Sequence, residues 1–176
     1  QFENYSPEYL LSHSCLRDHP KVFFEYYRQK MDARHVEPNI THYSLARLEE
    51  QGKLSAIVTQ NIDGLHQKAG SKKVCELHGT TLRNYCMRCR KNYSEDHIYD
   101  SEESIPKCDC GGMIRPDVTL YEEALSEESY NTAIHEISNG DLLIIAGTSL
   151  RVYPAASFIR FFRGKHIVVI NREKIG

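Results

Sequence analysis

Four of the six cysteines stand in two close pairs, a spacing that is typical of metal ligation. Cys86 and Cys89 form a Cys-x-x-Cys pair, and Cys108 and Cys110 form a Cys-x-Cys pair followed by two glycines. Two cysteine pairs separated by about 15–20 residues are typical of a zinc ribbon, in which one ion takes four thiolates. Because no neighbouring residue suggests an open coordination position or a general base, the pattern predicts a structural zinc site.

Other interpretations of these cysteines stay open. Four unrelated thiols or two disulfides are possible, but Met87, Arg88 and Asp109 between the cysteines are poor core residues. Only one residue separates Cys108 from Cys110, so this pair can span less distance at the metal than a Cys-x-x-Cys pair. If one of these cysteines does not bind the metal, His97 is the least unfavourable substitute ligand. Close pairs beside basic residues and glycines favour metal in a reducing compartment, so we expect the cytoplasm.

A polar segment follows the apolar run at 54–59 and offers groups that suit a nucleotide. Gln60, Asn61 and Asp63 present amide and carboxylate groups there. In open α/β sheets ligands bind outside the carboxyl ends of the strands. A capped turn that leads into a short helix, with Asp63 as the local cap, explains the same residues equally well.

His78 follows the apolar run at 74–77 and precedes a glycine. A histidine at the carboxyl end of a strand suits a general base near neutral pH. On its position alone, a structural histidine is the commoner interpretation.

Small residues follow a third apolar run, at 142–146. Gly147, Thr148 and Ser149 would let a phosphate or ribose approach backbone N–H groups and the start of the next helix. Asn171 ends the last apolar run and is placed to hold a second ribose.

These groups need a fold whose strands end at one edge. Short β-type runs alternate with helical segments at 41–51, 126–138 and 154–162. The last two runs, 141–146 and 166–170, are almost wholly apolar, as in strands covered on both faces of a parallel sheet. The sequence therefore predicts an α/β fold with a Rossmann-like, doubly wound parallel sheet.

Two further modules complete the predicted organisation. The opening residues read as helices, with caps expected at Ser6, Asp18 and Thr41. The stretch rich in cysteine, glycine and charge interrupts the α/β pattern as an inserted zinc ribbon. The predicted organisation is a helical module at 1–40, a Rossmann-like domain in two parts at 41–84 and 117–176, and a zinc-binding module at 85–116.

The composition is that of an ordinary globular protein, with 40% hydrophobic and 26% charged residues among 176. The formal net charge of −2 gives no reason to expect nucleic acid or an acidic membrane surface as a partner. No apolar run approaches the ~20 residues that cross a bilayer. The composition does not indicate an oligomeric state.

Together these motifs resemble the sirtuin family. The resemblance covers essentially the whole chain, because the blocks occur in sirtuin order and spacing. They are Thr59–His66, His78–Gly79, the cysteine pairs, Arg115–Val118 and Gly147–Ala156. Several blocks in order are far more specific than any one of them.

The resemblance implies an activity, protein-lysine deacylation, with NAD as a consumed co-substrate. In sirtuins the acyl-lysine carbonyl oxygen attacks C1′ of the nicotinamide ribose, and nicotinamide leaves. The histidine that matches His78 then helps to deprotonate a ribose hydroxyl, which attacks the imidate carbon. The products are the free lysine, nicotinamide and O-acyl-ADP-ribose.

The resemblance also implies residue roles. Asn61 and Asp63 would line the nicotinamide pocket, Gln60 would touch the nicotinamide ribose, and Ile62 belongs to the same cofactor-binding segment. Gly147, Thr148 and Ser149 would meet the phosphates and the adenosine side, and Asn171 the adenine ribose. An acylated-lysine peptide would add a strand beside Val118, Thr119 and Tyr121.

Two departures from the family pattern matter. The Gly-Ala-Gly-x-Ser loop with which sirtuins begin is not in this sequence, so we expect a piece of a longer protein. Where the family commonly has Val-Val-x-Phe-Gly-Glu, Thr119 replaces an apolar residue and Glu122 replaces the glycine. Acyl preference and the backbone pairing near Glu122 are therefore open.

Two other functions remain as alternatives. The same NAD chemistry can transfer ADP-ribose to a protein nucleophile. A non-catalytic fragment would keep zinc and peptide binding without a complete cofactor site.

Overall fold

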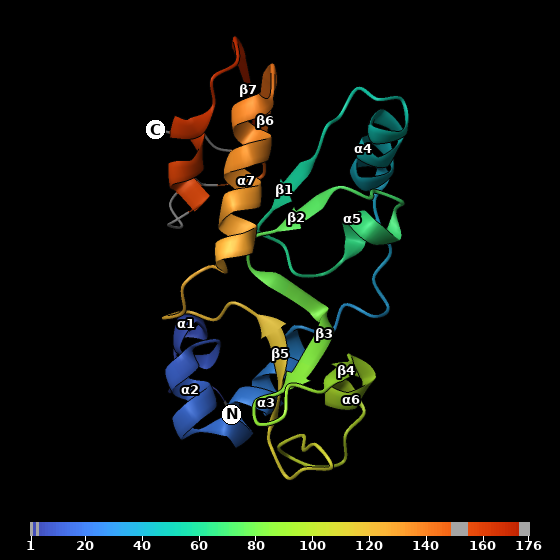
Figure 1. Ribbon diagram of the computed structural model, residues 1–176. Coiled ribbons are helices and arrows are strands. Elements are labelled where there is room, and N and C mark those ends of the chain that lie inside the picture. The colour runs from blue at the N-terminus through green and yellow to red at the C-terminus, as the bar shows by residue number, and fades with distance from the viewer. Residues whose placement is uncertain (1, 3, 149–154, 173–176) are drawn as a thin grey trace.

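The computed structural model describes residues 2, 4–148 and 155–172 (Figure 1). Helices α1–α3, a three-stranded antiparallel sheet and α6 form the lower half of the view. Two pairs of parallel strands, with α4, α5 and α7, form the upper half. This mixed α/β architecture with parallel strands confirms the predicted fold class.

The parallel strands form the Rossmann-like part. β1 (Ile57–Thr59) pairs with β2 (Val74–Glu76), and β6 (Leu142–Ala146) pairs with β7 (His166–Ile170). α5 (Leu65–Lys68) lies between β1 and β2 in the chain, and the 3-10 helix η1 (Ala155–Phe161) lies between β6 and β7. The connection from β6 to β7 is the strand–helix–strand crossover that the sequence predicts, and the connection from β1 to β2 is a second one.

Burial of the second pair differs from the prediction. Ile144 of β6 and Val169 of β7 are 47% and 50% exposed, and Ile170 is 60% exposed. The expectation that both faces of these strands are covered is therefore wrong for the described residues. Among them the two parallel pairs are separate two-stranded sheets.

α7 (Glu127–Asn139) packs against β2 of the first parallel pair and against η1. Ser126 caps it by accepting from the Ser129 N–H at 3.0 Å. Its buried Ala133 shares a small core with Cys75 of β2 and Phe158 of η1. This core fixes the β2 end, from which His78 follows.

The helical module forms the largest core of the protein together with the zinc-binding module. It contains α1 (Pro7–Leu10), α2 (His13–Asp18) and α3 (Pro20–Lys30). Phe23, Phe24 and Tyr27 of α3 are fully buried in the same cluster as Cys86 and Cys108. Burial of each such aromatic side chain contributes about 1.5–3 kcal/mol. The sequence boundaries at 40 and 85 stay predictions, but these two modules pack as one unit.

The helix starts test the predicted caps. Ser6 caps α1 as predicted, accepting from the Tyr9 N–H at 3.2 Å. Asp18 instead ends α2, and α3 begins at Pro20, whose fixed φ suits a first helical turn. α4 (Ile40–Glu50) is capped by Asn39 and not by Thr41.

The antiparallel sheet connects the two halves. β3 (Gly79–Cys86) runs between β4 (Asn92–Ser94) and β5 (Ile114–Val118), with α6 (Asp96–Tyr99) following β4. It starts beside the parallel strands and ends at the cysteines (Figure 1). Within the described ranges, no helix has the length and apolarity needed to cross a membrane.

Candidate active site and metal centre

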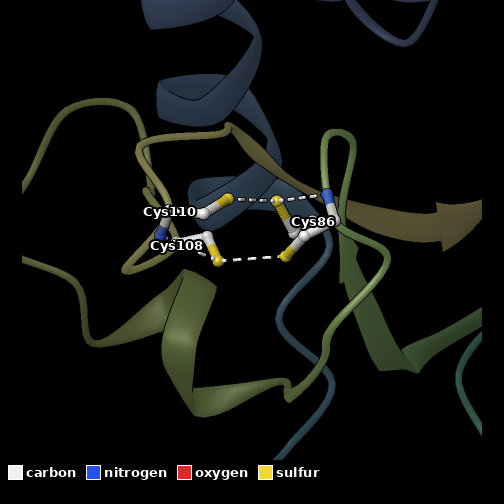
Figure 2. A group of neighbouring side chains, drawn as sticks. Cys86, Cys108 and Cys110 are labelled. Carbon is white, nitrogen blue, oxygen red and sulfur yellow. Dashed lines mark hydrogen bonds between the residues drawn. The ribbon is translucent and has the colours of Figure 1, made fainter.

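The four predicted metal ligands come together. Cys86 ends β3 and Cys89 lies in the turn that follows, while Cys108 and Cys110 precede β5. Their sulfur atoms all lie within 4.8 Å of one another. The Cys86–Cys110 and Cys89–Cys108 sulfur pairs are both 3.5 Å apart, and Figure 2 shows the sulfurs facing one another.

The surroundings of these sulfurs fit a tetrahedral zinc ion. Zinc–sulfur bonds of about 2.3 Å need sulfur atoms that close together. The Arg88 N–H points at the Cys86 sulfur at 3.3 Å, and the Cys110 N–H at the Cys108 sulfur at 3.5 Å. A Cβ on Gly112 would lie 2.6 Å from the Cys86 sulfur, so only glycine lets the loop approach.

The electrostatics differ among the thiols of this centre and favour a thiolate at Cys86. Burial works against the Cys86 thiolate, but the N–H groups of Cys89 and Arg88 and the neighbouring thiols lower its pKa overall. At Cys110 the Gly112 N–H works to lower the pKa, but the neighbouring thiols and burial raise it to about 12 when no metal is bound. A thiolate is the form that ligates zinc. The His97 ring lies tilted beside that of Tyr93, with ring centroids 4.4 Å apart, and is not in the four-sulfur group. Four thiolates fill a tetrahedral site, so the centre fits a structural zinc ion.

His78 lies where two parallel strands end. Its Nδ1 is 3.1 Å from the Gln60 backbone oxygen, and its own backbone oxygen accepts from the Thr119 N–H at 2.8 Å. A carbonyl oxygen only accepts, so Nδ1 carries the proton and Nε2 keeps a lone pair. The lone pair on Nε2 can therefore accept a proton from a group that lies beside it.

Gln60 joins His78 to the third predicted segment. Its side-chain Nε2 donates to Thr148 Oγ1 at 3.2 Å, while its backbone oxygen meets the histidine. Gly147 precedes Thr148 with φ of 64° and donates its N–H to the Ile170 oxygen at 3.0 Å. Groups after β1, β2 and β6 thus converge at one edge, as expected for ligand sites in open α/β sheets.

The remaining candidate cofactor-binding residues differ in their hydrogen bonding and in their exposure. Asp63 Oδ1 accepts from the Leu65 N–H at 3.0 Å, so its carboxylate stabilises the turn before α5, although the N-cap residue of that helix is Gly64. Its carboxylate can still accept further hydrogen bonds. Asn61 is exposed, Ile62 is half-buried, and Asn171 is exposed after β7. Ser149 lies outside the described residues.

The predicted peptide segment continues β5. Val118 is opposite Gly79 of β3, and Thr119 is bonded to His78. Val118 is buried, Thr119 half-buried and Tyr121 52% exposed. The segment therefore runs directly past the histidine.

Gly79 is a residue whose importance the sequence analysis missed. Its φ is 76°, and a Cβ there would collide with the Asp117 backbone oxygen and lie 3.2 Å from Val118 Cα. Only glycine lets β3 start this close to β5 beside His78. A His-Gly pair after a strand is a signal that could have identified it.

Replacing Gly79 with alanine is expected to destabilise the protein by about 1–2 kcal/mol for the left-handed backbone, plus a further ~1–3 kcal/mol for overpacking. Gly52 is the matched control, because its φ is 69° but a Cβ there meets nothing within 4 Å. Urea unfolding gives the free energy of unfolding of Gly79→Ala, Gly52→Ala and the unmodified chain. The loss in Gly52→Ala measures the cost of the left-handed backbone, and the additional loss in Gly79→Ala measures the cost of overpacking. Equal losses in the two variants would contradict the close approach of β3 and β5.

An ion pair that sequence analysis did not find supports the peptide segment. The buried guanidinium of Arg115 donates to both carboxylate oxygens of Glu123, at 2.6 and 2.9 Å. Burial works to raise the pKa of Glu123, but the hydrogen bonds from Arg115, the Leu120 N–H and His13 lower it to about 2. The bidentate pair therefore holds residues 115–123 as a fixed loop.

Comparison with known proteins is consistent with this geometry. A model of the Sir2 family matches residues 1–154. The NAD-dependent protein deacetylase of Clostridium acetobutylicum is 55% identical over 171 residues, which are 97% of this chain and 70% of that protein. The protein of the same name from Cutibacterium acnes is 53% identical over 169 residues, 96% of this chain and 69% of that protein.

Solved structures agree with these relatives. A structure described as Sir2 bound to acetylated peptide has a TM-score of 0.89 and 37% identity, covering 97% of this chain and 74% of its own. A Sir2 complex with a p53 peptide and NAD has a TM-score of 0.88 and 38% identity. That match covers 97% of this chain and 73% of the chain in the complex. With a family model over most of its length and relatives above half identity, the chain belongs to the Sir2 family.

Proposed function

We propose that the protein is an NAD-dependent protein-lysine deacylase, most simply a deacetylase. It transfers the acyl group from lysine to ADP-ribose, consuming one water and releasing nicotinamide and the free lysine. The observation that carries this proposal is the meeting of Gln60, His78 and Thr148 beside Thr119. This arrangement supports the proposal because it brings the candidate base close to two groups of residues. One is the set of strand ends where NAD would bind, and the other is the segment where the peptide would pair. The names of the bacterial relatives support the same activity.

His78 is the general base of the proposed reaction. Once nicotinamide has left and the acyl oxygen is bonded to C1′, a ribose hydroxyl must lose a proton to attack the imidate carbon. Nε2 of His78 accepts that proton, because Nδ1 is already committed to the Gln60 oxygen. The base acts after the bond to nicotinamide breaks.

The other site residues bind the two substrates. Asn61 and Asp63 line the nicotinamide pocket and Gln60 contacts the nicotinamide ribose, with Ile62 in the same cofactor-binding segment. An acidic and amide-rich pocket there stabilises the positive character that develops at C1′. Gly147, Thr148 and Ser149 take the phosphates, and Asn171 the adenine ribose. An acylated-lysine peptide pairs with Val118, Thr119 and Tyr121 as an added strand.

Zinc has no step in the proposed reaction. Bound by the four cysteines, it would hold their loops against α3, whose core they share, and β3 and β5 connect these loops to the histidine and the peptide strand. We place the enzyme in the cytoplasm, since close cysteine pairs that bind metal as thiolates suit a reducing compartment.

Isotope-labelled NAD tests the proposal. The protein is incubated with an acetyl-lysine peptide, a matched unmodified peptide, and NAD labelled in its adenosine half. Deacetylation predicts that the acetylated peptide loses one acetyl group and that the label appears in a small molecule with the mass of acetylated ADP-ribose. The unmodified peptide should leave NAD unconsumed.

The alternative functions give different outcomes in the same experiment. Label covalently attached to protein would favour transfer of ADP-ribose to a protein nucleophile. Peptide binding without any consumption of NAD would indicate a non-catalytic binding module. Either result would contradict deacylation.

A further inference from the structure

Glu122 stands at a position of the peptide segment that favours glycine. Residues Leu120 to Glu123 form a turn, closed by the Glu123 N–H donating to the Leu120 oxygen at 3.1 Å. Glu122 is the third residue of that turn, and its φ is 74°. A turn with positive φ at this position is of type II, in which glycine is strongly favoured. Glutamate therefore carries a conformational cost here that glycine would avoid.

The Glu122 carboxylate makes contacts that a glycine could not. Its Oε2 accepts from the Ser14 N–H at 2.9 Å and from the Ser14 hydroxyl at 2.7 Å. These hydrogen bonds lower the pKa of Glu122, so the group is ionised at neutral pH. Two donors on an ionised carboxylate are among the stronger hydrogen bonds of a protein surface.

The same contacts complete the first turn of α2. The His13 N–H donates to the Tyr121 oxygen at 3.0 Å, and the Cys15 N–H to the Ser12 hydroxyl at 3.0 Å. The Ser14 N–H between them is satisfied by Glu122. The Tyr121 N–H in turn donates to the Leu11 oxygen at 3.0 Å. The peptide segment thus supplies two of the three acceptors that the helix start needs.

We propose that Glu122 is a positioning residue for the acyl-lysine peptide, because it fastens the outer end of the 118–121 segment to α2. The inference rests on the proposed function, in which this segment pairs with the substrate. Thr119 is fixed at one end by His78, and Tyr121 and Glu122 are fixed at the other by α2. With both ends held, the segment is ordered before the peptide arrives, and the peptide does not have to order it.

Peptide affinity without turnover is the measurement that tests this role. A fluorescent acetyl-lysine peptide is titrated with the protein, and its dissociation constant is read from anisotropy. Glu122→Ala loses both hydrogen bonds from Ser14 and is expected to weaken binding about tenfold. Glu122→Gln keeps an oxygen acceptor for Ser14 and should stay within about twofold of the unmodified protein.

Two further variants separate fastening from backbone conformation. Glu122→Gly relieves the turn but removes the carboxylate, so it should bind the peptide as weakly as Glu122→Ala. Ser14→Ala removes the hydroxyl donor and keeps the N–H, and it should fall between the two extremes. Glu102→Ala is the control for the loss of an exposed carboxylate away from the segment and should bind normally.

Hydrogen exchange of the backbone distinguishes this inference from the proposed function. Glu122→Ala should speed exchange at Ser14 and Tyr121 while leaving the Cys86–Cys110 region unchanged. Unchanged exchange and peptide affinity in Glu122→Ala would overturn the positioning role, even if the protein deacetylates its substrate. If Glu122→Ala exchanges faster but the unmodified protein consumes no NAD, the positioning of the 118–121 segment by Glu122 stands and the deacylase proposal is overturned instead.

Discussion

Replacing His78 with alanine is expected to lower kcat for deacetylation by about 10²- to 10⁴-fold, the contribution of a general base. The ring of His78 contacts Gln60 through Nδ1, and the His78 backbone oxygen accepts from the Thr119 N–H, so the alanine variant loses the ring but keeps the backbone contact. Peptide KM should change little, because the proposed base acts only after both substrates are bound. Steady-state kinetics with an acetyl-lysine peptide measure both constants.

A second readout in the same variant distinguishes a base from a structural histidine. Cleavage of the bond to nicotinamide precedes the step that needs the base, so exchange of labelled nicotinamide into NAD should persist in His78→Ala. His35→Ala, which removes an exposed histidine away from the site, is the control and should match the unmodified protein in both assays. A kcat within about threefold of normal would contradict the role of His78, since it falls far below a general base's contribution.

Removing zinc is expected to unfold the helical module together with the cysteine loops. Cys86 and Cys108 share their hydrophobic cluster with Phe23, Phe24 and Tyr27, so the metal and α3 stabilise a common core. Binding energy for a structural zinc ion amounts to folding energy, of order 10 kcal/mol in small zinc-binding peptides. Chelation should therefore reduce the helical circular dichroism signal and the near-ultraviolet signal of the buried tyrosine.

A cysteine variant gives the same test without a chelator. Cys108→Ser should reduce zinc content from about one ion per chain to near zero, since the site loses one of four ligands. Cys75→Ala is the matched control, because Cys75 is also buried but lies in the other core beside Ala133. A fold that survives complete zinc removal would show that the shared core does not depend on the metal.

The metal site could be predicted from the sequence because its ligands form two short local patterns. Cys86 to Cys89 and Cys108 to Cys110 each bring sulfurs together by backbone geometry alone. The convergence of Gln60, His78 and Thr148 follows in the same way, since each of them comes just after an apolar strand. Local spacing combined with sheet topology was sufficient for these parts.

Contacts between distant segments could not be predicted in that way. The contacts of His13 with Glu123 and of Ser14 with Glu122 join α2 to the segment that follows β5, and the Arg115–Glu123 pair ties that segment back to β5. No periodicity relates those positions, and they meet only because the helical module packs on the antiparallel sheet. The sequence could indicate Glu122 as unusual, but not what its carboxylate binds.

Local propensity also decided some helix starts against the prediction. Asn39 is two residues before Thr41 and accepts from the Thr41 and His42 N–H groups at 2.9 and 3.3 Å, and asparagine is the better cap. For β6 and β7, the apolar composition indicates that the side chains should be buried, but it does not say which element covers them. Both strands keep side chains about half exposed among the described residues.

The fate of the acyl oxygen tests the central claim most directly. An acetyl-lysine peptide whose amide oxygen is a heavy isotope is incubated with NAD, quenched after a few turnovers, and its products are weighed by mass spectrometry. If the acyl oxygen attacks C1′ and a ribose hydroxyl then takes the acetyl group with the help of His78, the heavy oxygen is retained in O-acetyl-ADP-ribose. Heavy oxygen found in free acetate, with unlabelled or no O-acetyl-ADP-ribose, would contradict the account.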